Sequence, residues 1–175
     1  MPKPNRLYYG KAVYHVMFRG NNKQTILKTK YDKTALLLSI QKCQERKNFK
    51  IYGFVIMDNH AHLVIETNHL HNISKIMQSI LLSFSLKYRR KYGYEGYVWQ
   101  GRFQSKIIDS EHYFTQCIEY IHNNPVKAGI TETALEYIYS SARFYEGRSS
   151  KGVYDFMVLS PFGGSSSISA DSPKL

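Results

Sequence analysis

The sequence predicts an α+β fold in which an antiparallel sheet carries its helices on one face. Short runs rich in β-branched and aromatic residues alternate with longer stretches of helical periodicity, and Gly, Asn or Asp turns separate them. Their order is strand, helix, strand, strand, helix, strand, helix, which is the ferredoxin-like split β-α-β arrangement. We therefore expect one domain over residues 1–147 and a weakly structured to disordered tail over residues 148–175.

The first half of the chain supplies three of the expected strands and one helix. Residues 12–19 form the first strand, which stops at the turn Gly20-Asn21-Asn22. Residues 31–47 follow a helical pattern, with apolar positions on one side and charged positions on the other. Residues 51–57 and 60–66 are two further strands, and the two residues Asp58-Asn59 between them predict a tight hairpin.

A long amphipathic helix is expected after this hairpin. Apolar residues recur at three- and four-residue spacing over residues 73–88. The end of this helix is basic, with Lys87, Arg89, Arg90 and Lys91. Cations favour a helix C-terminus, so this cluster is either a solvated helix end or a DNA contact.

The remaining elements are a fourth strand and two helices. Residues 103–108 form the strand. The next helix begins at Asp109 or Ser110, either of which can cap it, and stops at Pro125. A last helix is expected over about residues 134–145.

The composition favours a nucleic-acid partner. The chain has 175 residues with 24 Lys and Arg against 13 Asp and Glu, a formal net charge of +11 and a pI near 9.6. Such a positive charge attracts polyanions. The alternative is a basic protein that has no nucleic-acid partner, because its composition would be the same. The 15 Tyr and 9 Phe shift the balance toward DNA or RNA, because aromatic faces stack on unpaired bases.

The sequence also indicates a cytoplasmic location. Only two cysteines are present, Cys43 and Cys117, too few for a disulfide framework. The first residues lack the apolar run of a signal peptide, and no stretch has the length of a membrane span. We therefore expect a reduced compartment and no membrane partner.

Two motifs suggest a metal site facing a tyrosine. His60 and His62 lie two residues apart in a strand, so both side chains point to one face and can bind one ion. Tyr120 and Asn124 lie one helical turn apart, so the phenol and the amide oxygen project side by side. Two imidazoles and one amide oxygen would leave positions open for substrate or water, as in catalytic metal sites.

Each motif alone is weak. His-x-His pairs are often ordinary polar residues at a strand end, the chain has 15 tyrosines, and Asn124-Pro125 is also a common way to end a helix. A phenol with a pKa near 10 is a poor nucleophile unless a nearby cation offsets its charge. The combination in one basic domain nevertheless predicts attack by Tyr120 on a metal-bound phosphate.

Over residues 7–146 the sequence resembles the HUH single-tyrosine transposases, in particular the branch called REP-associated tyrosine transposases. The matching segments, in order, are residues 14–16 (Tyr-His-Val), 19–21 (Arg-Gly-Asn), 52–63, 98–103, 119–130 and 139–142. The resemblance implies the HUH endonuclease fold, with Mg²⁺ or Mn²⁺ bound by His60, His62 and Asn124. Gln116, one turn before Tyr120, is the alternative third ligand.

The same resemblance implies that Tyr120 attacks single-stranded DNA and gives a 5′-phosphotyrosine and a free 3′-OH. The substrate would be a folded single strand, a hairpin at the ends of an element or a repeated palindrome. Family branches differ in whether they act as monomers or as homodimers with shared sites, and the sequence does not decide this. The expected DNA contacts are Arg19, Lys87, Arg89, Arg90, Lys91, Gln100 and Arg102.

Two other functions fit the same residues. One is another HUH nickase, a plasmid relaxase or replication initiator, although the long helicase or primase regions expected there are missing from this chain. The other is a domesticated protein that binds hairpin DNA without cutting it. The presence of His60, His62, Tyr120 and Asn124 together argues for cleavage.

Overall fold

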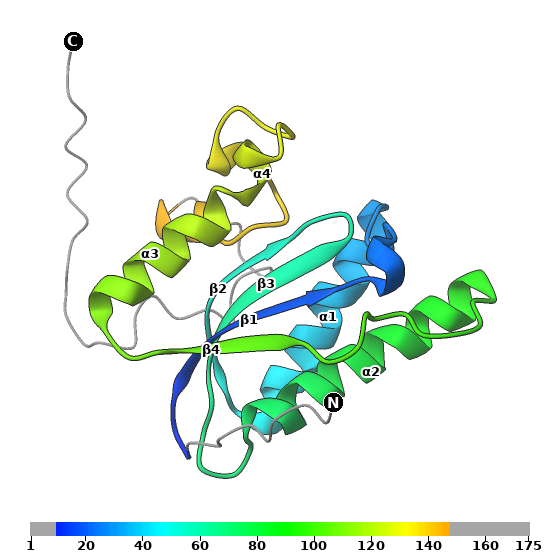
Figure 1. Cartoon of the computed structure of the whole chain (residues 1–175), viewed down its shortest axis with the longest axis horizontal. Helices are drawn as coiled ribbons and strands as arrows, with labels where there is room; N and C mark the ends of the chain where they lie inside the picture. Colours follow the sequence, from blue (N-terminus) through cyan, green and yellow to red (C-terminus); the bar gives the residue numbers. More distant parts are fainter. Residues whose placement is uncertain (1–9, 148–175) are drawn as a thin grey trace.

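In a computed structural model, which describes residues 10–147, four antiparallel strands form one sheet with the order β2-β3-β1-β4 (Figure 1). The strands are β1 (Val13–Arg19), β2 (Lys50–Ile56), β3 (His60–Glu66) and β4 (Gln104–Ile108). The main helices are α1 (Lys30–Lys47), α2 (Ile73–Tyr92) and α3 (Glu111–His122), and a short turn of 3-10 helix, η1, covers Asn21–Lys23. The ferredoxin-like order predicted from the sequence is confirmed.

Helices pack on both faces of the sheet, which corrects one expectation. Helices α1 and α2 pack together against one face, where they bury alternate residues of β1 and β3 such as Val16 and Leu63. Helix α3 packs on the opposite face, against Val13 and Val64 (Figure 1). The prediction of helices on one face is therefore wrong for α3. Strands with apolar side chains on both sides require a cover on both sides.

Side chains fix the start of each main helix. Thr29 and Asp32 form a capping box at α1, and Asn72 caps α2 by accepting a hydrogen bond from the backbone N–H of Lys75 at 3.0 Å. At α3 the cap is Ser110, whose Oγ accepts from the N–H of Tyr113 at 3.3 Å. Of the two caps expected from the sequence, the structure uses Ser110. Its position sets the rotation of the helix that carries Tyr120.

The single last helix predicted over residues 134–145 is wrong. The structure has three short pieces after α3: α4 (Asn124–Lys127), η2 (Ala134–Glu136) and α5 (Ala142–Tyr145). Between η2 and α5 the chain makes a turn and then pairs with β2 through a bridge from Ser140 to Val55: the N–H of Ile56 donates to Tyr139 at 2.9 Å, and the N–H of Ser141 donates to Phe54 at 3.0 Å. The backbone groups on this edge of β2 attract a pairing partner, and that pairing replaces helix formation.

Residues 1–9 and 148–175 lie outside the described part, and with them most of the predicted tail. None of the helices between residues 10 and 147 is long and apolar enough to cross a lipid bilayer.

Gly53 sets how closely α3 approaches the sheet. A Cβ atom on Gly53 would lie 2.7 Å from Cδ1 of Ile118 and 2.8 Å from Cδ1 of Ile121, both buried on α3. Such distances are shorter than carbon contacts allow, so only glycine permits this packing. The close approach brings the C-terminal half of α3, including Tyr120, over the strands that carry the histidines.

We predict that Gly53→Ala destabilises the fold by about 1–3 kcal/mol, because the new methyl group overpacks the interface with α3. The measurement is urea unfolding followed by circular dichroism. Ile118→Val removes Cδ1 of Ile118, one of the two atoms that the new methyl group would meet. Gly53→Ala should therefore lower the free energy of unfolding by less in that background. An equal cost in both backgrounds would contradict the role of Ile118.

Candidate functional site

His60 and His62 project from β3 toward the face covered by α3. Strand β3 pairs with β1 in a register that sets His62 opposite Met17 and His60 opposite Arg19. The two imidazole rings lie nearly perpendicular, with centroids 5.3 Å apart. The sequence prediction that both rings share one face is confirmed, and they lie beside α3 rather than beside α1 or α2.

Helix α3 places Tyr120 over these histidines. The ring of Tyr120 meets His62 edge-on at 5.6 Å between centroids and meets His15 at 6.0 Å. Its side chain remains 44% exposed, so the phenol is open to a macromolecular substrate. A depression between α3 and the strands β1 and β4 adjoins it, lined by His15, Met17, His62, Gln104, Ser105, Lys106, Tyr113, Gln116, Cys117 and Tyr120.

Asn124 lies just beyond the end of α3, and its side chain is hydrogen-bonded to that of His60. The amide nitrogen of Asn124 donates to the carbonyl of Tyr120 at 2.8 Å, which holds the side chain against the last turn of α3. Gln116, the alternative ligand, lines the same depression as His62 and Tyr120. The structure therefore brings Tyr120, His60, His62 and Asn124 together and leaves Gln116 nearby.

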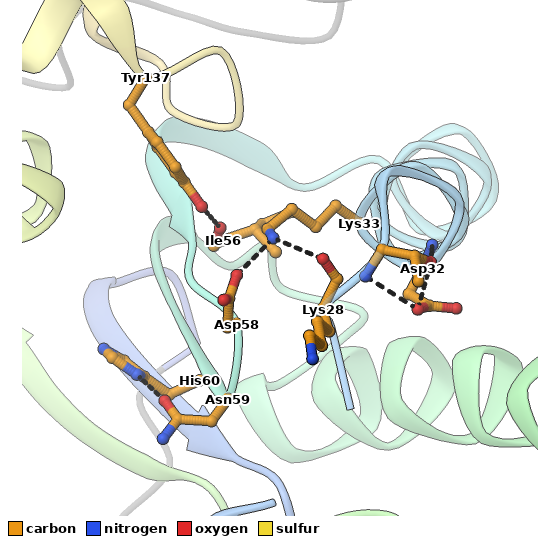
Figure 2. Close-up of polar contacts among 9 residues, drawn as sticks. Lys28, Asp32, Lys33, Ile56, Asp58, Asn59, His60 and Tyr137 are labelled. Carbon is orange, nitrogen blue, oxygen red and sulfur yellow. Dashed lines mark hydrogen bonds and ion pairs between the residues drawn. The ribbon is translucent and has the colours of Figure 1, made fainter. Parts of the chain in front are cut away.

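The turn between β2 and β3 is fixed from the helix layer (Figure 2). Lys33, buried in α1, forms an ion pair with Asp58 at 2.6 Å and approaches the carbonyl of Lys28 at 3.5 Å. Next along the turn, Asn59 Oδ1 lies 2.6 Å from Nδ1 of His60. Figure 2 shows this succession from α1 through the turn to His60. Asn59 thereby fixes the orientation of the His60 ring.

A second anchor holds the start of the turn. The hydroxyl group of Tyr137 donates to the carbonyl of Ile56 at 2.7 Å, as Figure 2 also shows. Tyr137 is buried and belongs to the chain segment that pairs with β2. The histidine strand therefore begins from a turn that is tied both to α1 and to the segment that follows α3.

Burial keeps the imidazoles neutral. It lowers the pKa of His62 to about 3, and the neighbouring His15 and His60 lower it further. Burial is also the main cause that lowers the pKa of His60, with a contribution from Arg19, while the hydrogen bond with Asn124 acts in the opposite direction. The pKa of His15 is lowered by burial and by Lys106. Neutral imidazole is the form that binds metals.

The donor set suits a divalent ion when an amide oxygen is included. Among residues 10–147, no group of three or more His, Cys, Asp or Glu side chains is arranged to hold a metal ion. Two neutral imidazoles with an amide beside them form an incomplete coordination sphere. Substrate oxygens or water are needed to complete it.

Sequence reasoning did not single out two residues that the structure places at this site. His15 in β1 contacts His62 directly, with Nε2 of His15 at 2.9 Å from Nδ1 of His62. The ammonium group of Lys127, in α4, lies 5.1 Å from the centroid of the Tyr120 ring. Strand alternation shows that His15 faces the same side as Met17. Its nearness to His62 depends on the pairing of β1 with β3, which no local pattern reveals.

The seven expected DNA contacts fall into two groups. Arg19, Gln100 and Arg102 surround one small depression beside His60, and Nε of Arg19 donates to Oε1 of Gln100 at 3.1 Å. Lys87, Arg89, Arg90 and Lys91 belong to α2, in the helix layer behind the sheet. Lys87 donates to Ser39 at 2.9 Å, and Lys91 forms an ion pair with Asp32 at 3.1 Å. Only the first group borders the histidine and tyrosine site.

Two solved structures have this fold. The structure of a REP-associated tyrosine transposase bound to a REP hairpin aligns with a TM-score of 0.72 and 20% identity, over 100% of this chain and 99% of that one. A crystal structure of a protein from Deinococcus radiodurans aligns with a TM-score of 0.50 and 17% identity, over 70% of this chain and 97% of that one. At these identities the likeness establishes the fold. No curated protein matches the sequence.

The family model described as "Transposase IS200 like" matches residues 8–124, a range that includes β1 to α3 and ends at Asn124. The match therefore contains both histidines, Tyr120 and the whole sheet. Because this family model matches most of its length, the chain belongs to the IS200-like transposase family.

Proposed function

We propose that this transposase cleaves single-stranded hairpin DNA and transfers the strand through a covalent bond to Tyr120. The observation that carries the proposal is the position of the Tyr120 ring, exposed to solvent yet 5.6 Å from His62 and one helical turn from Asn124. A nucleophile beside two neutral imidazoles and an amide oxygen is the arrangement that phosphodiester cleavage by a tyrosine needs.

In the proposed reaction the phenolic oxygen of Tyr120 forms a bond to the phosphorus of a phosphodiester. The bond from phosphorus to the 3′ oxygen breaks, and that oxygen leaves as a 3′-OH after taking up a proton. The 5′ phosphate remains on Tyr120. The reverse attack by a 3′-OH on this phosphotyrosine joins strands and restores the phenol, so no external energy source is required.

Four further residues of the site have roles in this proposal. His60, His62 and Asn124 would hold Mg²⁺ or Mn²⁺, which would offset the negative charge of the scissile phosphate. Lys127, 5.1 Å from the Tyr120 ring, adds a positive charge on the exposed side of the nucleophile. Asn124 also holds the end of α3 through the Tyr120 carbonyl, so the nucleophile and the amide move as one unit.

A hairpin substrate is supported by two further observations. The similar structure of the REP-associated tyrosine transposase is described as bound to a REP hairpin. In this chain, Arg19, Gln100 and Arg102 form an exposed polar surface beside His60, with donors for phosphates and base edges. A strand bound there would pass the histidine site.

The first prediction concerns the nucleophile. Tyr120→Phe should abolish the covalent adduct with hairpin DNA while leaving binding unchanged, because only the attacking oxygen is lost. The measurement is a denaturing gel of the protein incubated with labelled hairpin DNA and Mn²⁺. Tyr113→Phe is the matched control, since Tyr113 lies on the same helix and lines the same depression.

An adduct with wild type and Tyr113→Phe only would establish the reaction class. An adduct with Tyr120→Phe would contradict the proposal. Binding by wild type without any adduct would indicate a hairpin-binding protein that does not cut, whereas an adduct only with plasmid-origin DNA would indicate a relaxase or replication initiator.

The second prediction concerns the metal ligands. His60→Ala and His62→Ala should each lower the cleavage rate at least about 100-fold, since a bound ion contributes several kcal/mol to the transition state. Hairpin binding should persist. Cleavage rates are measured at a fixed Mn²⁺ concentration, with His112→Ala as control because His112 is exposed on α3.

Comparison of Asn124→Ala with Gln116→Ala identifies the third ligand. We expect the larger loss for Asn124→Ala, because its side chain contacts His60. Full activity of Asn124→Ala, together with loss in Gln116→Ala, would reassign that role.

The third prediction separates the two basic groups. Arg102→Ala should weaken hairpin binding by about 1–3 kcal/mol if Arg102 contacts a base edge. Arg90→Ala should have a smaller effect, because Arg90 lies in the helix layer away from the site. Affinities from fluorescence anisotropy at several salt concentrations test this. Equal losses would mean that the DNA contacts both surfaces.

A further inference from the structure

His15 makes a contact with His62 that the proposed function does not use. Nε2 of His15 lies 2.9 Å from Nδ1 of His62, and the two rings stack with an interplanar angle of 24° and centroids 5.1 Å apart. His15 comes from β1 and His62 from β3, 47 positions later in the chain. Lys106 and the Tyr120 ring also lie near His15 in this space.

A hydrogen bond between two neutral imidazoles can have only two forms. If His15 donates from Nε2, then Nδ1 of His62 accepts and its only proton is on Nε2, which therefore cannot bind a metal. If His62 donates from Nδ1, then Nε2 of His62 has a free electron pair, and His15 carries its proton on Nδ1. The direction of this one bond decides whether His62 can serve as a ligand through Nε2.

His60, the neighbouring proposed ligand, has the second of these two forms, with its proton on Nδ1. Oδ1 of Asn59, 2.6 Å from Nδ1 of His60, accepts a hydrogen bond, because the amide nitrogen of Asn59 is directed to the carbonyl of Lys23 at 3.4 Å. His60 therefore donates from Nδ1, and its Nε2, the nitrogen left for the contact with Asn124, carries no proton. Both histidines thus have a partner on Nδ1, one a side-chain amide and the other an imidazole.

We propose that His15 is a positioning residue that accepts a hydrogen bond from Nδ1 of His62 and so leaves Nε2 of His62 free to bind the divalent ion. The inference rests on the proposed function, because it assigns His62 to the metal. His15 itself does not bind the ion. Partners of this kind fix the tautomer and the orientation of a ligating histidine, and their loss lowers metal affinity about 10–100-fold.

The direct test is the tautomer of His62 in the full-length, metal-free protein at neutral pH. Long-range proton–nitrogen correlation spectra distinguish imidazoles protonated on Nδ1 from those protonated on Nε2. His62→Gln assigns the signals. We expect His62 to be protonated on Nδ1 and His15 also on Nδ1. A wild-type His62 protonated on Nε2 would overturn the proposal, whatever any variant does.

Two variants of His15 form a matched pair for metal binding. His15→Phe keeps a flat ring stacked on His62 but has no acceptor, whereas His15→Gln supplies an amide oxygen as acceptor. Titration with Mn²⁺ alone, followed by electron paramagnetic resonance, measures affinity without any cleavage. We expect about 10–100-fold weaker binding for His15→Phe and near wild-type binding for His15→Gln.

Activity measurements then separate this role from a structural one. In folded His15→Phe, high Mn²⁺ concentrations should restore adduct formation, and in Tyr120→Phe they should not. Unchanged Mn²⁺ affinity in folded His15→Phe would overturn the proposal. If His15→Phe does not fold, the proposal is tested by the tautomer of His62 in the wild-type spectrum and by the Mn²⁺ affinity of His15→Gln. If Tyr120→Phe still forms an adduct, the proposed function fails, while the tautomer of His62 still tests the inference separately.

Discussion

The pairing of β1 with β3 is the constraint on which the site depends. Its register sets His62 opposite Met17 and, two pairs further along, Val64 opposite His15, so His15 and His62 become diagonal neighbours on one face. The alternate residues of both strands fill the core under α1 and α2. A slip of one residue would exchange the faces and turn the imidazoles into that core. The apolar core therefore fixes the histidine face as strictly as it fixes the fold.

The position of Tyr120 depends on a different kind of contact, the approach of α3 to the sheet at Gly53. A closely packed interface transmits displacement, so a shift of α3 would change the distance between Tyr120 and His62. The histidines are held from the other layer, through Lys33 and the turn at Asp58. Side chains held on rigid helices and strands keep their geometry better than side chains on loops, and here the α1–α2 layer and α3 both pack on the same sheet.

Local periodicity explains what could be predicted from the sequence. Spacing of two in a strand and of four in a helix correctly placed His60 beside His62 and Tyr120 beside Asn124, and the order of elements predicted the topology. The features that were missed depend on contacts between distant segments. The face chosen by α3, the pairing of residues 139–141 with β2 and the contact of His15 with His62 all follow from tertiary packing.

The charges around the site couple its two proposed ligands. Arg19 lowers the pKa of His60 and Lys106 lowers that of His15, so the field of these cations reaches the imidazoles. The same field disfavours a divalent cation bound alone and attracts a phosphate. A DNA phosphate at Arg19 would reduce the repulsion on the ion, and the ion would in turn strengthen phosphate binding, as linkage requires. In the proposed reaction, metal and DNA would therefore bind cooperatively. The divalent ion that offsets the charge of the phosphate would be fully bound only when the substrate is present.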